Sequence, residues 1–240
     1  MRLMLTRPRA DSESLATELR ARGNEAVIEP MLEIVPVGPL PPLDGVAAVV
    51  VTSSNGIRTF AAVSERRDLT IYAVGDATAL TAREAGFTKV ESAQGDAAAL
   101  GALIAARADP AAGALLHIQG RDVTGNLDDS LVARGYSVRP AVMYEARAAN
   151  ELSMEACDFI AGRQIDVILF FSPRTARTFV RLVKKVGLAD RCEAMIALCL
   201  SAAVAKAGSA LIWGGVHIAV APDRAAMLQL CDAVQESGRT

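Results

Sequence analysis

The sequence lacks the features that mark several protein classes. Its two histidines are far apart, and its four cysteines (Cys157, Cys192, Cys199 and Cys231) form neither a CxxC pair nor a cysteine–histidine cluster. Neither a metal site nor a histidine-based catalytic triad is therefore supported, and we interpret the cysteines as reduced, mostly buried thiols. The glycines form neither a GxGxxG fingerprint nor a phosphate-binding loop with its lysine, so nothing in the sequence supports nucleotide binding.

The sequence also lacks a large net charge and long apolar runs. The formal net charge of −2 provides no broad basic field, which argues against nucleic-acid binding. No apolar run approaches the roughly 18 residues of a membrane span, and the N-terminus reaches a charge too early for a signal peptide. We expect a soluble, cytoplasmic protein that contacts neither nucleic acid nor membrane. With 52% hydrophobic residues, it can bury a sizeable core.

One stretch occurs twice and organises the chain. Val49-Val-Val-Thr-Ser-Ser-Asn-Gly-Ile-Arg-Thr-Phe60 returns as Ile168-Leu-Phe-Phe-Ser-Pro-Arg-Thr-Ala-Arg-Thr-Phe179, with Ser53 matching Ser172. A second pair of segments, 9–23 and 121–135, ends in the same Ala-Arg-Gly. A repeat of half-molecules predicts two similar lobes with a cleft between them.

The pattern of apolar runs alternates between strands and helices. The expected strands lie near 3–6, 26–29, 47–53, 70–74, 88–92, 114–119, 137–142, 166–171, 194–199 and 216–220. The expected helices lie near 11–22, 55–66, 76–86, 96–107, 124–134, 151–162, 173–186, 201–207 and 223–236. This alternation predicts an α/β protein whose lobes each contain a parallel sheet flanked by helices, in a flavodoxin- or Rossmann-like arrangement.

The first strand and helix are too few to make a domain, and the part after residue 150 is also short of a full sheet. We therefore expect a discontinuous lobe of residues 1–34 and 148–240, with residues 38–143 inserted as a second lobe. Two extended connectors, near 31–37 and 143–147, should run side by side as a two-stranded link.

Helix starts that follow strands are the main candidate binding features. Ser172 is placed as an N-cap, with Pro173 at the first helical position. Free N–H groups and the helix dipole suit an anion there, and Arg7, Arg9, Arg121, Arg174 and Arg177 fall near such ends. The alternatives are ordinary capping and solvated surface arginines.

Three further residues have open roles at this stage. We interpret His117 and His217, both within expected strands, as hydrogen-bonded core residues. Tyr144 lies on the second connector. It could donate a proton to a leaving group, or it could anchor the connector to one lobe.

An ordered set of motifs resembles the uroporphyrinogen-III synthase family across nearly the whole chain. The set comprises Thr6-Arg-Pro8, Thr52-Ser-Ser-Asn-Gly-Ile-Arg58, Val74-Gly-Asp-Ala-Thr-Ala79, Gly120-Arg-Asp122, Tyr144-Glu-Ala146 and Phe171-Ser-Pro173. Each motif is weak alone, but their common order is specific.

The resemblance implies cofactor-free cyclisation of hydroxymethylbilane to uroporphyrinogen III in tetrapyrrole and haem biosynthesis. The terminal pyrrole ring would be inverted through a spiro intermediate. The implied partners are this polycarboxylate linear tetrapyrrole and, by hand-over, the enzyme that makes it, and our default is a monomer. The alternative is a two-lobed binding or sensor protein for a small anionic ligand, without chemistry.

The resemblance also implies roles for individual residues. Tyr144 resembles the family's general-acid tyrosine. The expected substrate-binding residues are Arg7, Ser53, Ser54, Asn55, Gly75, Asp76, Thr78, Gly120, Arg121, Ser172, Pro173, Arg174 and Ser201. Two positions depart from the pattern: Leu200-Ser-Ala-Ala-Val204 replaces a Gly-x-x-Thr turn, and Asp76 stands where an asparagine would suit a carboxylate better. We keep Ser201 only as a backbone or hydroxyl contact, and Asp76 could instead cap the next helix.

Overall fold

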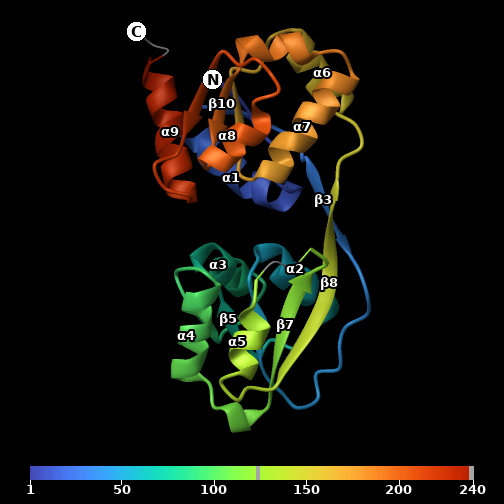
Figure 1. Cartoon of the computed structure of the whole chain (residues 1–240), viewed down its shortest axis with the longest axis vertical. Helices are drawn as coiled ribbons and strands as arrows, with labels where there is room; N and C mark the ends of the chain where they lie inside the picture. Colours follow the sequence, from blue (N-terminus) through green and yellow to red (C-terminus); the bar gives the residue numbers. More distant parts are fainter. Residues whose placement is uncertain (123–124, 238–240) are drawn as a thin grey trace. The chain divides into compact units, whose positions relative to one another are not determined.

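The computed structural model describes residues 1–122 and 125–237 and separates into two compact units. Unit 1 combines Met1–Glu33 with Arg147–Thr240, and unit 2 is the continuous segment Ile34–Ala146. Unit 2 is therefore inserted in the sequence of unit 1. Each unit contains one sheet with helices on both faces (Figure 1), which confirms the predicted fold class.

Unit 1 contains a five-stranded sheet in the order β11-β10-β9-β1-β2, and all of its strand pairs are parallel. Its elements are β1 (Arg2–Leu5), α1 (Arg9–Ala21), β2 (Glu25–Ile28), α6 (Met154–Ala161), β9 (Val167–Phe170), α7 (Pro173–Lys185), β10 (Ile196–Cys199), α8 (Ala202–Gly208), β11 (Gly215–Ile218) and α9 (Arg224–Ser237). Alternate strand residues face opposite sides. Ile168 and Phe170 pack with α6–α8, whereas Val167 and Leu169 pack with α1 and α9.

Unit 2 contains a six-stranded sheet in the order β3-β8-β7-β4-β5-β6. Its helices and strands are β4 (Val46–Val51), α2 (Ser54–Val63), β5 (Thr70–Ala73), α3 (Asp76–Glu84), β6 (Val90–Ser92), α4 (Ala97–Arg107), β7 (Ala114–Gly120) and α5 (Leu127–Val132), with the connecting strands β3 (Leu32–Pro36) and β8 (Val138–Ala148). Helices α2 and α3 cover one face through Phe60 and Ala82, and α4 and α5 cover the other through Ile104 and Leu131.

The two sheets have the same spatial order when β4, β5, β6, β7 and β8 are placed on β9, β10, β11, β1 and β2. The chain order differs, because unit 2 begins with the strands that come last in unit 1. In each sheet, successive strands are added outward from the middle, first toward one edge and then toward the other. The point where the direction reverses lies between β9 and β1 in unit 1 and between β4 and β7 in unit 2. Ligands of open α/β sheets bind beyond the carboxyl ends of the strands at such points.

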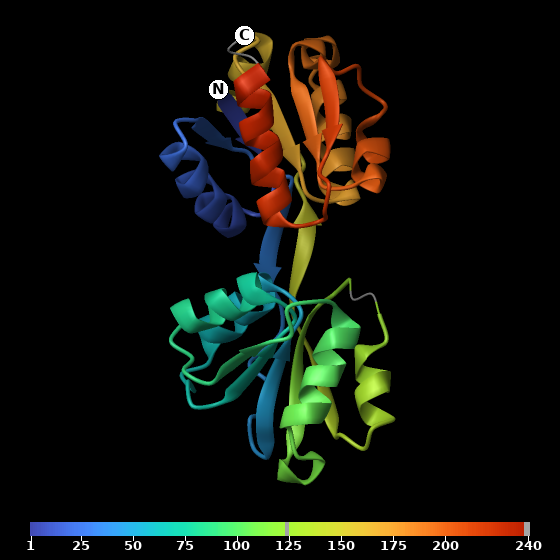
Figure 2. The same ribbon diagram turned by 90° about the vertical axis from the view of Figure 1, so that its left-hand side faces the viewer.

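Strands β3 and β8 lie side by side in both views (Figures 1 and 2). The N–H of Val37 donates to the carbonyl of Met143, and the N–H of Ala149 donates to that of Met31. From the first pair to the second, the residue number on the β3 side falls from 37 to 31 and the number on the β8 side rises from 143 to 149, so the two strands are antiparallel. The expected strand near 137–142 and the expected connector after it form one continuous strand, β8.

Buried polar contacts tie the two chain segments of unit 1 together. The Thr6 hydroxyl donates to the carbonyl of Leu169 at 2.6 Å. The buried Glu29 carboxylate accepts hydrogen bonds from the N–H and the hydroxyl of Ser153, at 2.8 and 2.7 Å. Since Ser153 also caps α6, Glu29 fixes the start of a helix that lies far away in the sequence.

Some expected boundaries differ from the structure. The helix expected near 124–134 covers only Leu127–Val132, and Thr124 lies outside the described residues. Two short 3-10 helices, Pro110–Ala112 and Ala189–Ala194, lie where no element was expected. Within residues 1–122 and 125–237, no helix combines the length and apolar character required to cross a membrane.

Candidate functional site

The clearest candidate site in unit 2 lies at the carboxyl ends of β4, β5 and β7. Ser53 has an extended backbone, and its hydroxyl accepts the N–H of Asn55 at 3.1 Å, which caps α2. Ser54 and Asn55 follow as the first residues of α2, and the Asn55 side-chain oxygen accepts Arg58 Nη1 at 3.1 Å. The N–H groups of Gly56 and Ile57 donate to the Ser53 carbonyl, so the N–H of Ser54 is the amide of this first turn that remains available to an anion.

The second strand end of unit 2 is more open. Gly75 occupies the N-cap of α3 without a side-chain bond, and the nearest heavy atoms lie more than 4 Å from where its Cβ would be. Asp76 is the first residue of α3, so the suggestion that it caps this helix is wrong. Its exposed carboxylate interacts favourably with the positive end of the helix dipole but repels a bound anion. Thr78 is buried one turn later and lies under this surface.

Gly120, Arg121 and Tyr144 meet where β7 ends beside β8. The N–H of Arg121 donates to the carbonyl of Tyr144 at 2.8 Å, which fixes the two strands in register. The exposed Arg121 guanidinium lies 3.2 Å from the carboxylate of Glu145. A substrate carboxylate would therefore compete with Glu145 for Arg121.

Unit 1 has a matching site at the carboxyl ends of β9 and β1. The Ser172 hydroxyl accepts the N–H of Thr175 at 3.1 Å, and Pro173 is the first residue of α7, as predicted. Arg174 is the next residue of that helix and is half-buried. Arg7 follows β1, where its guanidinium stacks 4.8 Å from the Phe171 ring centre and pairs with Asp11 at 3.1 Å.

The second turn of unit 1 is less polar than its counterpart in unit 2. Ser201 is the N-cap of α8, but its hydroxyl does not cap the helix. Val204 is buried at 1% exposure and packs in the core. Only the backbone and hydroxyl of Ser201 are therefore offered to a ligand at this turn.

A hollow of about 440 Å³ lies beside the start of α7, lined by Pro173, Arg177, Ala203, Lys206 and Ala207. Among the described residues, neither Arg177 nor Lys206 has an ion-pair partner. Arg177 is among the basic residues expected near the strand ends, whereas Lys206 is not, because its position near the end of α8 is typical of a lysine that complements a helix dipole. The motif order alone gave no signal for it.

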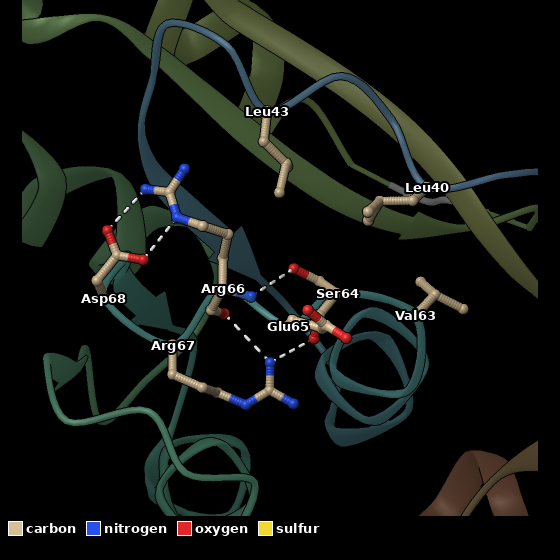
Figure 3. Close-up of a pocket in the computed structure, with 8 residues that line it drawn as sticks. All are labelled: Leu40, Leu43, Val63, Ser64, Glu65, Arg66, Arg67 and Asp68. Carbon is tan, nitrogen blue, oxygen red and sulfur yellow. Dashed lines mark hydrogen bonds and ion pairs between the residues drawn. The ribbon is translucent and has the colours of Figure 1, made fainter.

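A larger pocket of unit 2, about 680 Å³, lies away from the strand ends described above (Figure 3). Its lining residues are Leu40, Leu43, Val63, Ser64, Glu65, Arg66, Arg67 and Asp68, from the segments that precede β4 and β5. Arg66 donates two hydrogen bonds of 2.6 Å to Asp68, which lowers the pKa of that carboxyl to about 2. The second arginine of this pocket, Arg67, donates to the backbone carbonyls of Ala61, Ser64 and Ala85, so both guanidinium groups are already engaged and neither is open to a substrate carboxylate.

The two histidines have different environments. His117 is buried, its Nδ1 lies 2.6 Å from an Asp128 oxygen, and Gln119 donates to the other oxygen at 2.6 Å. This confirms its interpretation as a hydrogen-bonded core residue. The same interpretation of His217 is wrong, because the side chain is exposed on the edge strand β11.

This chain is similar over most of its length to uroporphyrinogen-III synthases. The family model described as "Uroporphyrinogen-III synthase HemD" matches residues 13–229. The uroporphyrinogen-III synthase of Chlorobaculum parvum is 26% identical over 222 residues, covering 86% of this chain and 89% of that protein. The crystal structure of uroporphyrinogen-III synthetase from Helicobacter pylori is 16% identical with a TM-score of 0.63, and the match covers 98% of this chain and all of the other.

The solved structure supports the fold, and the family model covers residues 13–229, which include the strand ends at Ser53, Gly75, Gly120, Ser172 and Ser201 but not Arg7 after β1. This chain therefore belongs to the uroporphyrinogen-III synthase family, whose hydro-lyase activity serves tetrapyrrole biosynthesis.

Proposed function

We propose that this chain converts hydroxymethylbilane to uroporphyrinogen III, with Tyr144 as the general acid. The observation that carries the role of Tyr144 is its place beside Gly120 and Arg121, at the carboxyl edge of unit 2 where the helix N-termini also lie. A half-buried phenol at that edge can reach a bound ligand and still be held by its strand.

The proposed chemistry is balanced by the loss of one water. The Tyr144 hydroxyl donates its proton to the hydroxymethyl oxygen as the C–O bond breaks, which releases water and leaves an azafulvene. The substituted carbon of the terminal ring attacks the azafulvene carbon to give the spiro intermediate. One bond of the spiro intermediate then breaks, and the macrocycle recloses with the terminal pyrrole ring in the opposite orientation. The proton lost in reclosure restores the phenol.

Substrate binding is proposed to use many weak, similar contacts. In unit 2 these are Ser53, Ser54, Asn55, Gly75, Asp76, Thr78, Gly120 and Arg121, and in unit 1 they are Arg7, Ser172, Pro173, Arg174 and Ser201. Asp76 contributes only its backbone N–H, because its carboxylate repels an anion. Helix N–H groups and guanidinium forks both bind carboxylates, so such a set suits a polycarboxylate. Holding the reacting carbons in place is the larger part of this catalysis.

The test is to incubate the protein with freshly made hydroxymethylbilane, oxidise the products and separate the uroporphyrin isomers. Mostly type III isomer, against type I without enzyme, is the expected result. Tyr144→Phe should lower kcat by roughly 10²-fold, the scale of general acid catalysis. Tyr136→Phe is the matched control, because the buried Tyr136 hydroxyl donates only to backbone carbonyls of Ile104 and Ala108.

Only type I product from the wild-type protein would overturn the proposed activity. Tight calorimetric binding of a hydroxymethylbilane analogue without any type III product would favour the sensor alternative. Full activity in Tyr144→Phe would remove Tyr144 as the acid but leave the activity itself in place.

The remaining parts of the proposal concern organisation. We assign residues 1–34 with 148–240 and residues 38–143 as the lobes, linked near 31–37 and 143–147. The separation of the chain at Glu33/Ile34 and Ala146/Arg147 supports this division. We also propose a cytoplasmic monomer that receives its substrate from the enzyme that makes it. Sedimentation equilibrium should give 25.2 kDa, and a twofold mass would contradict the monomer.

A further inference from the structure

The ladder between β7 and β8 contains an irregularity beside Tyr144. Gln119 is opposite Val142, but the next residue, Gly120, is opposite Tyr144, so Met143 is an extra residue on β8. The Met143 side chain is 2% exposed and packs in the core beneath α2 and α3. A β-bulge of this kind re-aims the side chain that follows it.

The bulge places Tyr144 on the side of the sheet that α2 covers. Gly120 shares this side with Ile118, two residues earlier on β7, since alternate residues of a strand face the same way. A Cβ on Gly56 of α2 would lie 3.5 Å from Ile118 Cγ2 and 3.6 Å from Tyr144 Cε1. One edge of the tyrosine ring therefore lies against the first turn of α2.

The other edge of the ring lies against Gly120. A Cβ there would be 2.9 Å from both Cε2 and Cζ of Tyr144 and 3.1 Å from its hydroxyl oxygen. The backbone of Gly120 is outside the left-handed region, so its conformation does not require glycine. Glycine at this position instead leaves the space that the phenol occupies.

We infer that Gly120 and the Met143 bulge form a seat that positions the Tyr144 phenol for proton donation, with Gly56 as the opposite wall. Gly120 thus acts through Tyr144, in addition to the backbone contact with the substrate proposed above, which alanine at this position would keep. This inference deepens the proposed function and rests on it for the chemical role of Tyr144. The seat itself is a property of unit 2 that can be measured without substrate.

The test compares Gly120→Ala, Tyr144→Phe and the double variant in kcat and KM. An added methyl group must displace the ring by several tenths of an ångström, and misplacement by about 1 Å can cost 10²-fold. Gly120→Ala should therefore lower kcat about 10-fold or more with little change in KM, whereas the double variant should match Tyr144→Phe alone. Losses that multiply in the double variant, or a change confined to KM, would overturn the positioning role.

Gly101→Ala is the matched control. Gly101 lies in α4, where a Cβ would meet Leu127 Cδ1 at an ordinary 3.7 Å, so this variant should keep wild-type kcat. A second readout is ¹⁹F NMR of protein labelled with 3-fluorotyrosine, in which the Tyr144 signal is identified by its loss in Tyr144→Phe. That signal should shift in Gly120→Ala and stay unchanged in Gly101→Ala. An unmoved signal in Gly120→Ala would overturn the seat.

The two readouts separate the inference from the proposed function. If Tyr144→Phe retains full activity, the acid role and its positioning both fail, and the NMR signal still decides whether the seat exists. If Gly120→Ala does not fold, the double variant Gly120→Ala/Tyr144→Ala removes the crowded ring and should melt like Tyr144→Ala. If the double variant still melted below Tyr144→Ala, the need for glycine at position 120 would not come from the Tyr144 ring, and the seat would be overturned.

Discussion

The strand ends of the two units keep the same helix caps but differ in the side chains around them. Ser53 and Ser172 both cap the helix that follows the central strand. When β4 is placed on β9, Gly56 coincides with Thr175, which is 2% exposed and donates to the Ser172 carbonyl at 2.9 Å. At this position unit 1 therefore has a buried side chain, whereas unit 2 has the glycine that lies beside Tyr144.

The neighbouring strands show the same difference. When β1 and β2 are placed on β7 and β8, the two buried methionines Met31 and Met143 coincide, and Leu32 stands in the place of Tyr144. Pro8 then stands in the place of Gly120. The repeat has kept helix caps at the strand ends of both units, whereas at this place only unit 2 has a phenol and a glycine beside it.

The largest predicted effect concerns the thiols, which belong to unit 1 alone, because residues 34–146 contain no cysteine. Burial raises the pKa of Cys192 and Cys231 to about 12 and that of Cys199 to about 11. Only the thiolate reacts, and the unfolded thiol has a pKa of about 8.5. At pH 8, alkylation of Cys192 by iodoacetamide should be about 10³-fold slower in folded than in urea-unfolded protein, measured by mass spectrometry. Comparable rates in the two states would show that unit 1 opens freely.

The same pKa shifts give the sign of a pH effect on stability. Below about pH 8.5 the thiols are protonated in both states, so the stabilisation is complete. As pH rises from there toward 11, the unfolded chain loses protons that the folded unit 1 retains, and the free energy of unfolding falls. Trp213, the chain's one tryptophan, reports unit 1 by fluorescence, and its urea midpoint should be lower at pH 10 than at pH 7.5.

Exchanging side chains between the units should remove the difference between their strand ends. Gly56→Thr introduces into unit 2 the residue that unit 1 has at the matching position, and its additional side-chain atoms would crowd the Tyr144 ring. We expect about 10-fold lower kcat and a loss of about 1–3 kcal/mol in unfolding free energy from overpacking.

Gly56→Ala is the control for this exchange. Its Cβ makes ordinary contacts at 3.5–3.6 Å, so activity should persist and the helix should gain stability. The reciprocal Thr175→Gly should lower the unfolding free energy by about 1 kcal/mol or more, mainly because a buried methyl group and the hydrogen bond to the Ser172 carbonyl are lost. If Gly56→Thr and Gly56→Ala behaved alike in turnover and urea titration, the space at Gly56 would have no bearing on Tyr144.

The smallest predicted effect tests what the two units share. Ser53→Ala and Ser172→Ala should each lower the unfolding free energy by about 1 kcal/mol, the usual cost of losing an N-cap. The loss should be larger at Ser172, whose hydroxyl also donates to Thr175 Oγ1 at 3.2 Å. Threonine at either position should restore most of the loss in urea titrations. No cost at one position would mean that the caps are not equivalent.

The local features of this fold could be predicted because they depend on neighbouring residues. Ser172 before Pro173 specifies a capped helix start, and the repeated segments indicate two similar lobes. The candidate site depends on contacts that are distant in sequence and leave no local signal. The pairing of Arg121 with Glu145 and the bulge at Met143 follow from the register of β7 on β8, which periodicity does not specify. The position of His217 within an expected strand predicts a core residue, but that strand is at the edge of its sheet and the side chain is exposed.

The insertion of unit 2 sets the order in which the protein can be completed on the ribosome. Strand β1 lies in the interior of its sheet, where one of its neighbours is β9, from beyond residue 147. All strands that flank the seat of Tyr144 are made before that neighbour emerges. At about 5–20 residues per second, the first segment of unit 1 waits on the order of 10 s for its partner, while unit 2 folds from continuous chain. The nascent protein thus completes the unit that contains Tyr144 first, and the unit that begins the chain is finished last.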